Sequence, residues 1–372
     1  MKKVYINDYS CFSSLGLGVQ KNWTAVQNLK SGIQKIEQFG AIENFHCGKI
    51  KDQWIEQAWN ELNIQAEYSR LEKIMILTLK PLVEKYQMSE NTALVLATTK
   101  GNIDFLENLP TEKADLHHLA KKIQDFFQFK NTPIILSNAC VSGTLAVAVA
   151  KRFIQMNRFS DAYVLAGDEV TSFVLSGFKS FQAMSDEICQ PFDQNRKGIN
   201  LGEAAAAAYL STVEIQQQSF EILGESSIAD ANHISGPSRT AEGLFLSIQN
   251  ALKEAKIDKN EIDCISAHGT ATIFNDEMES IAIDRMALNE TPIHSLKAYF
   301  GHTLGAAGLL ELIMVMESLK NNQRIVSKGF ESLGVSKELN ITTKKEAKPM
   351  RIALKTASGF GGVNTALLIE KK

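Results

Sequence analysis

The sequence predicts an α/β protein with mainly parallel strands. Short apolar runs that are typical of strands alternate along the chain with longer runs that are typical of helices, and this alternation is characteristic of β-α-β units. Several strand-like runs lead into a turn that carries a polar residue and then into a helix-like run. The second half of the chain has the same order of elements as the first, a strand, a turn with a polar residue and a helix, although no residue-level repeat proves a duplication.

The expected elements follow from the length and the flanks of these runs. The strand candidates are Thr92–Ala97, Pro133–Ser137, Ala162–Ala166, Glu261–Ala267, Ile352–Lys355 and Thr365–Ile369. The helix candidates are Val141–Met156, Thr240–Lys256, Glu277–Leu288 and Leu304–Leu319. The polar stretch Glu214–Ser219 is the most plausible seam between two halves. We therefore expect an N-terminal half over residues 1–213 and a C-terminal half over residues 214–372.

The composition is that of an ordinary globular protein, with 44% hydrophobic and 22% charged residues. The net charge of -3 gives no general attraction to nucleic acid or to anionic membranes. The N-terminal segment has no apolar stretch of the kind that a secretory signal needs, and no run is long enough to span a bilayer. Five scattered cysteines without a close Cys-x-x-Cys pair favour reduced thiols in a cytoplasm over a disulfide framework or a zinc site.

Cys140 occupies a position where a cysteine can act as a nucleophile. It follows a strand run and precedes a run that is apolar on nearly every side, which indicates a buried helix. At the start of such a helix, the helix dipole and the unpaired N–H groups favour the thiolate form. A lone cysteine beside alanines is more often a small core residue. The position therefore favours a catalytic role without establishing it.

His268 is the second candidate for a catalytic residue. It lies just after the strand run Glu261–Ile265, at the end of the strand where open α/β sheets place their ligands. The following helix is expected to begin near Asn275, with a capping side chain and acidic residues in its first turn. The competing interpretation is that His268 is a structural hydrogen-bonding residue.

Glu311 is the only charged residue in the helix run Leu304–Met316. A lone buried carboxylate costs on the order of several kcal/mol unless it is paired, so a nearby cation is required. Lys297 or a protonated histidine is the natural partner. The alternative is that Glu311 faces solvent, and that the small residues at 305–308 only allow close helix packing.

A glycine-rich segment surrounds Phe360 between the last two strand candidates. Three glycines within residues 359–362 indicate unusual backbone angles and a close approach to another group. The alternative is a plain hairpin turn.

In this order and spacing, the four segments resemble those of the elongating β-ketoacyl–acyl carrier protein synthases of the thiolase superfamily. The most specific motifs are His-Gly-Thr-x-Thr at 268–272, Gly-His-x-x-Gly-Ala-Ala-Gly at 301–308 and Gly-Phe-Gly-Gly-x-Asn at 359–364. The resemblance covers nearly the whole chain and includes Pro-Phe-Asp-Gln-Asn-Arg-Lys-Gly at 191–198. It implies a thiolase-like five-layer αβαβα sandwich of two similar halves, with the nucleophilic cysteine in the first half and the two catalytic histidines in the second.

The resemblance also implies the reaction. An acyl thioester on Cys140 would undergo a decarboxylative Claisen condensation with malonyl-acyl carrier protein, giving a 3-oxoacyl-acyl carrier protein in fatty-acid or in specialised polyene or polyketide synthesis. The backbone N–H groups of Cys140 and Phe360 would form the oxyanion hole. His268 and His302 would stabilise the enolate that decarboxylation leaves.

Further roles follow from the same resemblance. Lys297 and Glu311 would form a supporting charged pair. Thr270 and Thr272 would hydrogen-bond the pantetheine arm, Phe360 would gate the acyl pocket, and Gly361 would belong with Phe360 to the substrate-binding set. The substrates would arrive on the phosphopantetheine of acyl carrier protein, with no metal and no free cofactor. We expect a cytoplasmic homodimer, or a heterodimer with a related subunit, that binds no nucleic acid and does not insert into membranes.

The chain departs from the family pattern in three places. The nucleophile stands in Ser-Asn-Ala-Cys-Val, where the family has Ala-Cys-Ser or Ala-Cys-Ala, often after Asp-Thr. The first strand region reads Asn-Asp-Tyr-Ser-Cys-Phe rather than a glycine-rich run, and the chain is shorter than typical members between Gly48 and Asn131. These departures favour a specialised pathway over the housekeeping fatty-acid enzyme.

Three other functions compete with this interpretation. A degradative thiolase would need a second catalytic cysteine in a C-terminal Cys-Gly motif, which this chain lacks, since its last cysteine is Cys264. The initiating synthases carry an asparagine in place of the second histidine, so His302 speaks against them. A chain-length-factor-like subunit, which pairs with a true synthase and has no nucleophile, is disfavoured by Cys140.

Overall fold

Two stacked β-sheets form the framework of the computed structural model, which describes residues 2–106, 111–215, 219–230 and 236–372. The first sheet has the order β1-β9-β7-β5-β6 and is built from β1 (Tyr5–Ser13), β5 (Thr92–Ala97), β6 (Ile134–Leu136), β7 (Asp161–Asp168) and β9 (Ala204–Ser211). The second has the order β12-β11-β13-β14-β10 and is built from β10 (Phe220–Ala229), β11 (Cys264–Ser266), β12 (Ile293–His294), β13 (Ile352–Gly359) and β14 (Val363–Lys371). A short pairing of β1 with β10 makes the two sheets continuous.

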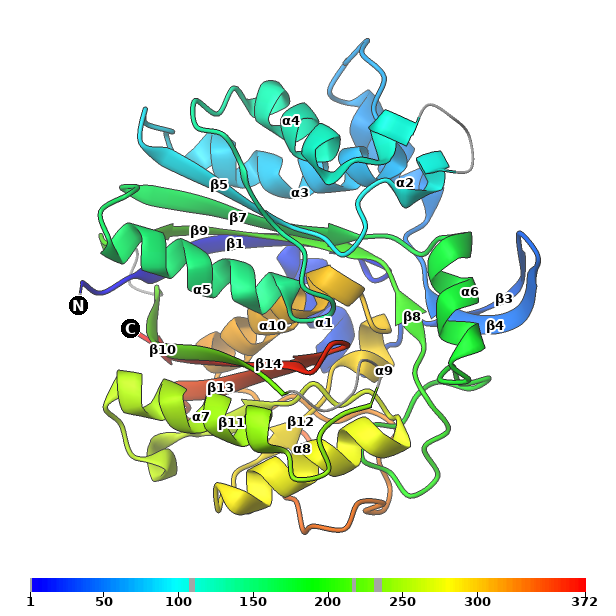
Figure 1. Cartoon of the computed structure of the whole chain (residues 1–372), viewed down its shortest axis with the longest axis vertical. Coiled ribbons are helices and arrows are strands. Elements are labelled where there is room, and N and C mark those ends of the chain that lie inside the picture. The colour runs from blue at the N-terminus through cyan, green and yellow to red at the C-terminus, as the bar shows by residue number, and fades with distance from the viewer. Residues whose placement is uncertain (1, 107–110, 216–218, 231–235) are drawn as a thin grey trace.

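Helices lie outside both sheets and between them, so that the fold has five layers (Figure 1). The outer layer on the first sheet contains α2 (Asp52–Asn60), α3 (Arg70–Lys85) and α4 (Leu116–Phe127). The middle layer contains α5 (Ser142–Gln155) and α10 (Ala307–Asn321), with α1 (Val19–Gln27) beside them. The outer layer on the second sheet contains α7 (Glu242–Ala255) and α8 (Ile273–Arg285). This is the αβαβα sandwich that the resemblance implies.

The expectation of mainly parallel strands is wrong. Among the named strands of the described residues, parallel pairing is confined to β5 with β6 and β7, β11 with β12 and β13, and a small contact between β4 (Ile42–Gly48) and β8 (Leu201–Gly202). The pairs β1–β9, β7–β9, β10–β14 and β13–β14 are antiparallel. The connection between β13 and β14 has only three residues, and a connection that short forces an antiparallel hairpin.

Most predicted elements lie where the sequence placed them, with shifted ends. Only Cys264–Ser266 of the run 261–267 is a strand, because Lys259–Glu261 forms a 3-10 turn instead. Helix α10 is preceded by a 3-10 turn at Leu304–Ala306, and α8 begins at Ile273 rather than near Asn275. The expected seam Glu214–Ser219 contains residues 216–218, which lie outside the described residues.

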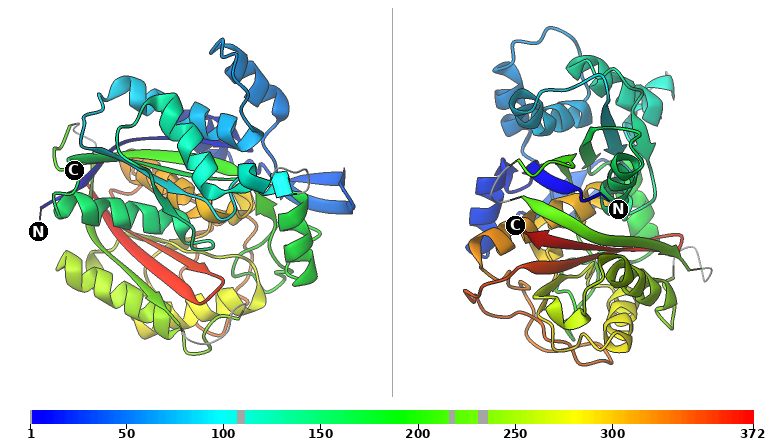
Figure 2. Two further views of the ribbon diagram at one scale, coloured as in Figure 1. Left: turned by 45° about the horizontal axis from the view of Figure 1, so that its top comes forward. Right: turned by 90° about the vertical axis from the view of Figure 1, so that its left-hand side faces the viewer.

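The periphery of the fold is simple. The strands β2 (Gly16–Leu17) and β3 (Gln34–Phe39) pair with β1 and β4, and the β3–β4 hairpin extends away from the sandwich (Figure 2). Helices α6 (Ser172–Ser180) and α9 (Lys297–Phe300) complete the named helices. The two chain ends lie on the same side of the molecule (Figure 2). Within the described ranges, no helix is both long and apolar enough to cross a membrane.

Candidate active site

Cys140 lies in a tight turn between β6 and α5. Ala139 before it has a φ of 45°, a left-handed backbone conformation that residues with side chains rarely adopt. The Oγ atom of Ser142 stabilises the turn, because it accepts the N–H of Asn138 at 2.8 Å and donates to the carbonyl of Ala139 at 2.7 Å. Val141 is the N-cap of α5, so the turn holds Cys140 at the start of the helix, as predicted.

Cys140 is a thiol rather than a thiolate at neutral pH. Burial raises the pKa of its thiol to about 11, against the opposing charges of Lys297 and Lys100 and a hydrogen bond from the backbone N–H of Phe360. The expectation that the helix start favours the thiolate is therefore wrong for the resting protein. Removal of the sulfur from water outweighs the helix dipole, because desolvation penalises the charged form.

His268 and His302 face Cys140 across a short gap. The sulfur and one ring nitrogen of each histidine lie within 4.8 Å of one another, and the two rings meet edge to face with centroids 5.1 Å apart. His268 follows the end of β11 by two residues, as predicted, and the N–H of His302 is held by the carbonyl of Asn200 at 2.7 Å. Burial, followed by the charge of Lys297, lowers the pKa of both histidines well below 6.5, so both are neutral.

The two rings leave hydrogen-bonding capacity unused. Nδ1 of His268 and both ring nitrogens of His302 are buried and have no hydrogen-bond partner within the described part of the chain. A neutral imidazole has one donor and one acceptor nitrogen, and buried polar atoms are normally paired. Unpaired nitrogens on two neighbouring rings that line one cavity point to a ligand oxygen there.

Glu311 is buried in α10 and pairs with two lysines. Lys297 hydrogen-bonds Oε1, and the Nζ atom of Lys355 lies 2.7 Å from Oε2. The pair with Lys297 was predicted, whereas Lys355 was missed. The alternatives of a solvent-facing Glu311 and of a protonated-histidine partner are both wrong, because the carboxylate is 2% exposed and the histidines are neutral.

Four buried charged side chains hold the backbone of residues 266–271, the segment that contains His268. Lys355 donates to the first two carbonyls of this segment, at 3.4 and 3.5 Å, and Lys297 donates to the third at 2.9 Å. Glu279 accepts the N–H groups of residues 268 and 269 at 2.7 and 2.6 Å. Asp276 accepts those of residues 270 and 271 at 2.9 and 3.2 Å. The backbone around His268 is thus held through its carbonyl groups by the lysines and through its N–H groups by the carboxylates.

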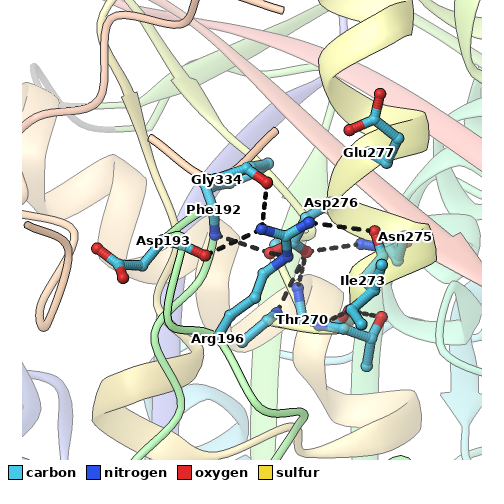
Figure 3. A network of polar contacts seen from close by, with 12 residues as sticks. Phe192, Asp193, Arg196, Thr270, Ile273, Asn275, Asp276, Glu277 and Gly334 are labelled. Atoms are coloured by element: carbon cyan, nitrogen blue, oxygen red, sulfur yellow. Dashed lines mark hydrogen bonds and ion pairs between the residues drawn. The ribbon is translucent and has the colours of Figure 1, made fainter. Parts of the chain in front are cut away.

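Asp276 also joins this segment to a second loop (Figure 3). Its Oδ2 atom accepts the N–H of Phe192 at 2.7 Å, and Nε of Arg196 lies 3.9 Å from the same oxygen. Burial raises the pKa of Asp276 to about 7. Asp276 lies in the first turn of α8, as predicted, and its carboxylate also contacts neighbouring loops. Helix α8 begins earlier than predicted, at Ile273, and the prediction of a capping side chain is wrong.

One cavity of about 440 Å³ adjoins these groups. The predicted site residues among those that line it are Cys140, His268, Thr270, Thr272, His302 and Phe360. The Oγ1 atoms of Thr270 and Thr272 lie 2.8 Å apart at its wall. Gly361, with a φ of 87°, forms the tip of the β13–β14 hairpin and is not among the lining residues.

Phe360 contributes both its backbone and its ring to the cavity. The ring is 39% exposed and packs against Phe178 and Phe181, with centroids 5.7 and 5.4 Å apart. A Cβ atom on Gly359 would lie 3.2 Å from the nitrogen of Cys140, so the hairpin approaches the nucleophile turn closely. Both interpretations of this segment hold, since it is a hairpin and it also borders the cavity.

Gly143 and the glycines of the 301–308 motif allow the close helix packing that the small residues at 305–308 suggested. A Cβ on Gly143 would lie 2.7 Å from the carbonyl oxygen of Gly305, and one on Gly308 would lie 2.8 Å from the backbone nitrogen of Thr144. The starts of α5 and α10 can approach this closely only because these positions lack side chains. This contact brings the Cys140 turn next to the His302 segment.

A sulfur and two imidazoles are also a donor set that zinc accepts. Here the charges of Lys297 and Lys100 act on Cys140, and those of Lys297 and Lys355 act on both histidines. This positive surrounding opposes a bound cation and suits an anionic ligand.

Two family models and several curated proteins match this chain. Residues 86–214 match the model of the beta-ketoacyl synthase N-terminal domain, and residues 220–328 match that of the C-terminal domain. A putative mitochondrial 3-oxoacyl-[acyl-carrier-protein] synthase of Schizosaccharomyces pombe is 25% identical over 100% of this chain and 99% of its own. The 3-oxoacyl-[acyl-carrier-protein] synthase 2 of Staphylococcus aureus is 26% identical over 100% and 98%.

Solved structures share the fold. A ketosynthase in complex with its chain length factor, from Xenorhabdus doucetiae, superposes with a TM-score of 0.87 at 24% identity, over 100% of this chain and 98% of the other. A beta-ketoacyl synthase from Burkholderia phymatum superposes with a TM-score of 0.86 at 23% identity, over 100% of both chains.

Proposed function

Because the chain belongs to the β-ketoacyl synthase family, as a synthase of the elongating type, we propose that it condenses an enzyme-bound acyl thioester with malonyl-acyl carrier protein. The reaction is a decarboxylative Claisen condensation, and the product is a 3-oxoacyl-acyl carrier protein. The observation that carries the proposal is the one cavity that Cys140, His268 and His302 line together.

The first half-reaction transfers the acyl group to Cys140. The sulfur attacks the thioester carbonyl of the acyl carrier protein, and the oxyanion accepts the backbone N–H groups of Cys140 and Phe360. Because the pKa of the thiol is raised to about 11, a nearby base must take its proton. The imidazoles of His268 and His302, each with a ring nitrogen within 4.8 Å of the sulfur, are in place to accept it. The proton then leaves with the pantetheine thiol of the carrier.

The second half-reaction forms the carbon–carbon bond. Malonyl-acyl carrier protein loses CO2, and the enolate oxygen accepts hydrogen bonds from His268 and His302. The enolate carbon attacks the acyl carbonyl on Cys140, the carbon–sulfur bond breaks, and the released thiolate takes a proton from water. Two preorganised donors at the oxygen where charge develops are worth roughly 3–4 kcal/mol each. Neutral histidines can fill this role, because each presents one N–H donor to the enolate oxygen. Neither has to remove a carbon-bound proton, because the loss of CO2 creates the carbanion.

The surrounding residues support this chemistry. Lys297 and Glu311 form the charged pair beneath the histidines. Thr270 and Thr272 line the cavity where the pantetheine arm would lie, and Phe360, with Gly361 at the tip of its hairpin, would gate the acyl pocket. The substrates are carried by acyl carrier protein, with no free cofactor and no metal. The positive surroundings of the cavity support this part of the proposal.

The assembly is a second part of the proposal. We infer a dimer, either of two identical chains or with a related subunit. The fold shared with a ketosynthase bound to its chain length factor supports the heterodimer and a specialised pathway such as polyene or polyketide synthesis. The competing function, a non-catalytic chain-length-factor-like subunit, is disfavoured by Cys140. Catalysis by the purified chain alone would indicate a homodimer, and activity only after copurification with a related subunit would indicate a heterodimer.

Two further expectations remain proposals. The two halves, 1–213 and 214–372, are supported by the strand order, since one sheet takes its strands from residues before 213 and the other from residues after 214. A cytoplasmic location is supported by the five cysteines, all of which are free thiols.

The test is a reconstituted condensation with defined acyl carrier proteins. We expect the purified protein to form an acyl adduct from acyl-acyl carrier protein and to release CO2 and a 3-oxoacyl-acyl carrier protein when malonyl-acyl carrier protein is added. Absence of an adduct across a panel of acyl chain lengths, tested with and without a copurified partner subunit, would overturn the proposal.

A further inference from the structure

Lys355 is a fully buried cation in the middle of a buried strand, β13. It lies in β13, which runs parallel to β11, and their register places it opposite Ser266, two residues before His268. Its side chain has no exposed surface. Burial lowers the pKa of its ammonium group, and the buried negative charge of Glu311 opposes that effect. A buried cation is costly unless its contacts compensate, so those contacts show what the residue does.

The contacts of Lys355 join its own strand, Glu311 and the backbone just before His268. Its Nζ atom donates to the carbonyl of Thr356 at 2.6 Å and more weakly to those of Ser266 and Ala267, and it lies 2.7 Å from Oε2 of Glu311. The carbonyls of Ser266 and Ala267 immediately precede His268 in the chain. Lys355 therefore connects the charged pair of the site with the backbone that carries one of its histidines.

The charge of Lys355 also acts on three histidines. It lowers the pKa of His268 and of His302, and with burial it lowers the pKa of His294 in β12 to about 3. The other charged or titratable groups around the two active-site histidines come from several elements: Lys297 of α9, Lys100 after β5, Glu311 of α10, Asp276 and Glu279 of α8, Asp168 of β7 and Cys140. Removal of Lys355 would leave Glu311 and Glu279 less neutralised.

We propose that Lys355 is a positioning residue of the condensation, which fixes the backbone that leads into His268 and supplies a second positive charge behind the two histidines. The proposal rests on the proposed function, since it assigns Lys355 to that reaction. The added charge favours the neutral form of both rings, and a neutral ring does not form an ion pair with the malonyl carboxylate, a pair that would stabilise the ground state and slow the loss of CO2. The added charge also favours the negative charge that decarboxylation creates.

The test replaces Lys355 and compares it with a matched buried lysine. Lys355→Met removes the charge and the contacts with similar side-chain length, and Glu311 keeps Lys297 as its partner. Lys151→Met is the control, because Lys151 is also buried and pairs with Glu254 at 2.6 Å, but it lies in α5 outside the cavity. Lys355→Gln keeps a hydrogen-bond donor and removes the charge. It therefore separates the role of Lys355 in fixing the backbone from its electrostatic role.

The first readout is decarboxylation of malonyl-acyl carrier protein between pH 5.5 and 8.5. We expect Lys355→Met to lower kcat with little change in KM. Because the histidine pKa values should be higher in this variant, its activity should fall about tenfold further for each pH unit below them. Lys355→Gln should recover kcat at pH 8 but keep the loss at low pH. Lys151→Met should follow the wild type. A constant ratio of wild-type to Lys355→Met activity across the pH range would overturn the proposal.

The second readout is the titration of the histidine rings by NMR. We expect the pKa values of His268, His294 and His302 to rise in both Lys355 variants and to stay unchanged in Lys151→Met. Unchanged titration of these rings would refute the electrostatic role, whatever the activity. If the wild type failed to decarboxylate malonyl-acyl carrier protein, the proposed function would be wrong. The titration would still test whether the charge of Lys355 acts on these histidines.

Discussion

The ammonium nitrogen of Lys355 lies 2.7 Å from Oε2 of Glu311, the carboxylate oxygen that Lys297 does not bind. The sequence alone predicts that loss of Lys297 would strand Glu311. With a second lysine on the other oxygen, that carboxylate stays paired when either lysine is lost.

The two lysines should therefore be coupled in their effect on stability. Lys297→Met should cost about 1–3 kcal/mol, the range for losing a hydrogen bond to a charged group. The double variant Lys297→Met with Lys355→Met should cost more than the sum of the two singles, because only the double variant leaves Glu311 buried without a cation, a change that itself costs about 3–5 kcal/mol. Adding Glu311→Leu should restore much of the loss. Urea denaturation of the full set measures the coupling, and strictly additive losses would show that the lysines do not share Glu311.

The reactivity of Cys140 should rise steeply with pH. Because the pKa of its thiol is raised to about 11, alkylation by iodoacetamide should accelerate about tenfold per pH unit between pH 7 and pH 9. Lys100→Met should slow the reaction, since it removes a charge that lowers this pKa. Peptide mass spectrometry follows the rate at Cys140 itself. A rate that is already constant above pH 7 would mean that the thiolate is the resting form.

The two histidines should separate the half-reactions. His268→Ala and His302→Ala should each slow decarboxylation of malonyl-acyl carrier protein by about 10²–10³-fold, the effect of losing one donor to a developing oxyanion. Acylation of Cys140 should suffer less, because the other imidazole remains near the sulfur. Decarboxylation at near wild-type rates in both variants would remove the enolate-stabilising role.

Glu279 should matter for activity although it does not line the cavity. Glu279→Gln replaces an acceptor of the N–H groups of His268 and Gly269 with a group that also presents a donor. The His268 segment should shift, and displacements of about 1 Å in an active site can cost on the order of 10²-fold in rate. Steady-state kinetics should show the loss mainly in kcat. Glu277→Gln, on the same helix but paired with Ser336 at the surface, is the matched control and should retain wild-type kinetics.

The sequence predicted the groups that carry the chemistry better than the groups that hold them. Cys140, His268, His302 and the Lys297–Glu311 pair stand in motifs whose local pattern indicates a turn, a strand end or a buried helix. Lys355 had a weaker signal of the same kind as Glu311, a single charge in an apolar run. Its partner could not be inferred, because that contact depends on the register of β13 with β11 and on the packing of α10 against the second sheet.

Two other differences between the sequence predictions and the structure involve tertiary contacts, which a local sequence pattern does not contain. Asp276 lies in the first turn of α8, as predicted, but its carboxylate also accepts the N–H groups of Phe192 and Thr270, and the helix begins at Ile273 rather than near Asn275. The thiolate expected at Cys140 depended on the helix dipole and on the unpaired N–H groups of the helix start. The degree of burial that reverses this expectation exists only once both halves enclose the sulfur.

The most direct test of the account is mass spectrometry of the acylated protein. After incubation with acyl-acyl carrier protein, the wild type should gain the mass of one acyl group, and proteolysis should place it on Cys140. Cys140→Ala should fold normally, since alanine fits the buried turn, and should gain no acyl group. Addition of malonyl-acyl carrier protein should remove the adduct from the wild type and yield the 3-oxoacyl-acyl carrier protein. An acyl adduct that survives in Cys140→Ala would place the nucleophile elsewhere and contradict the account.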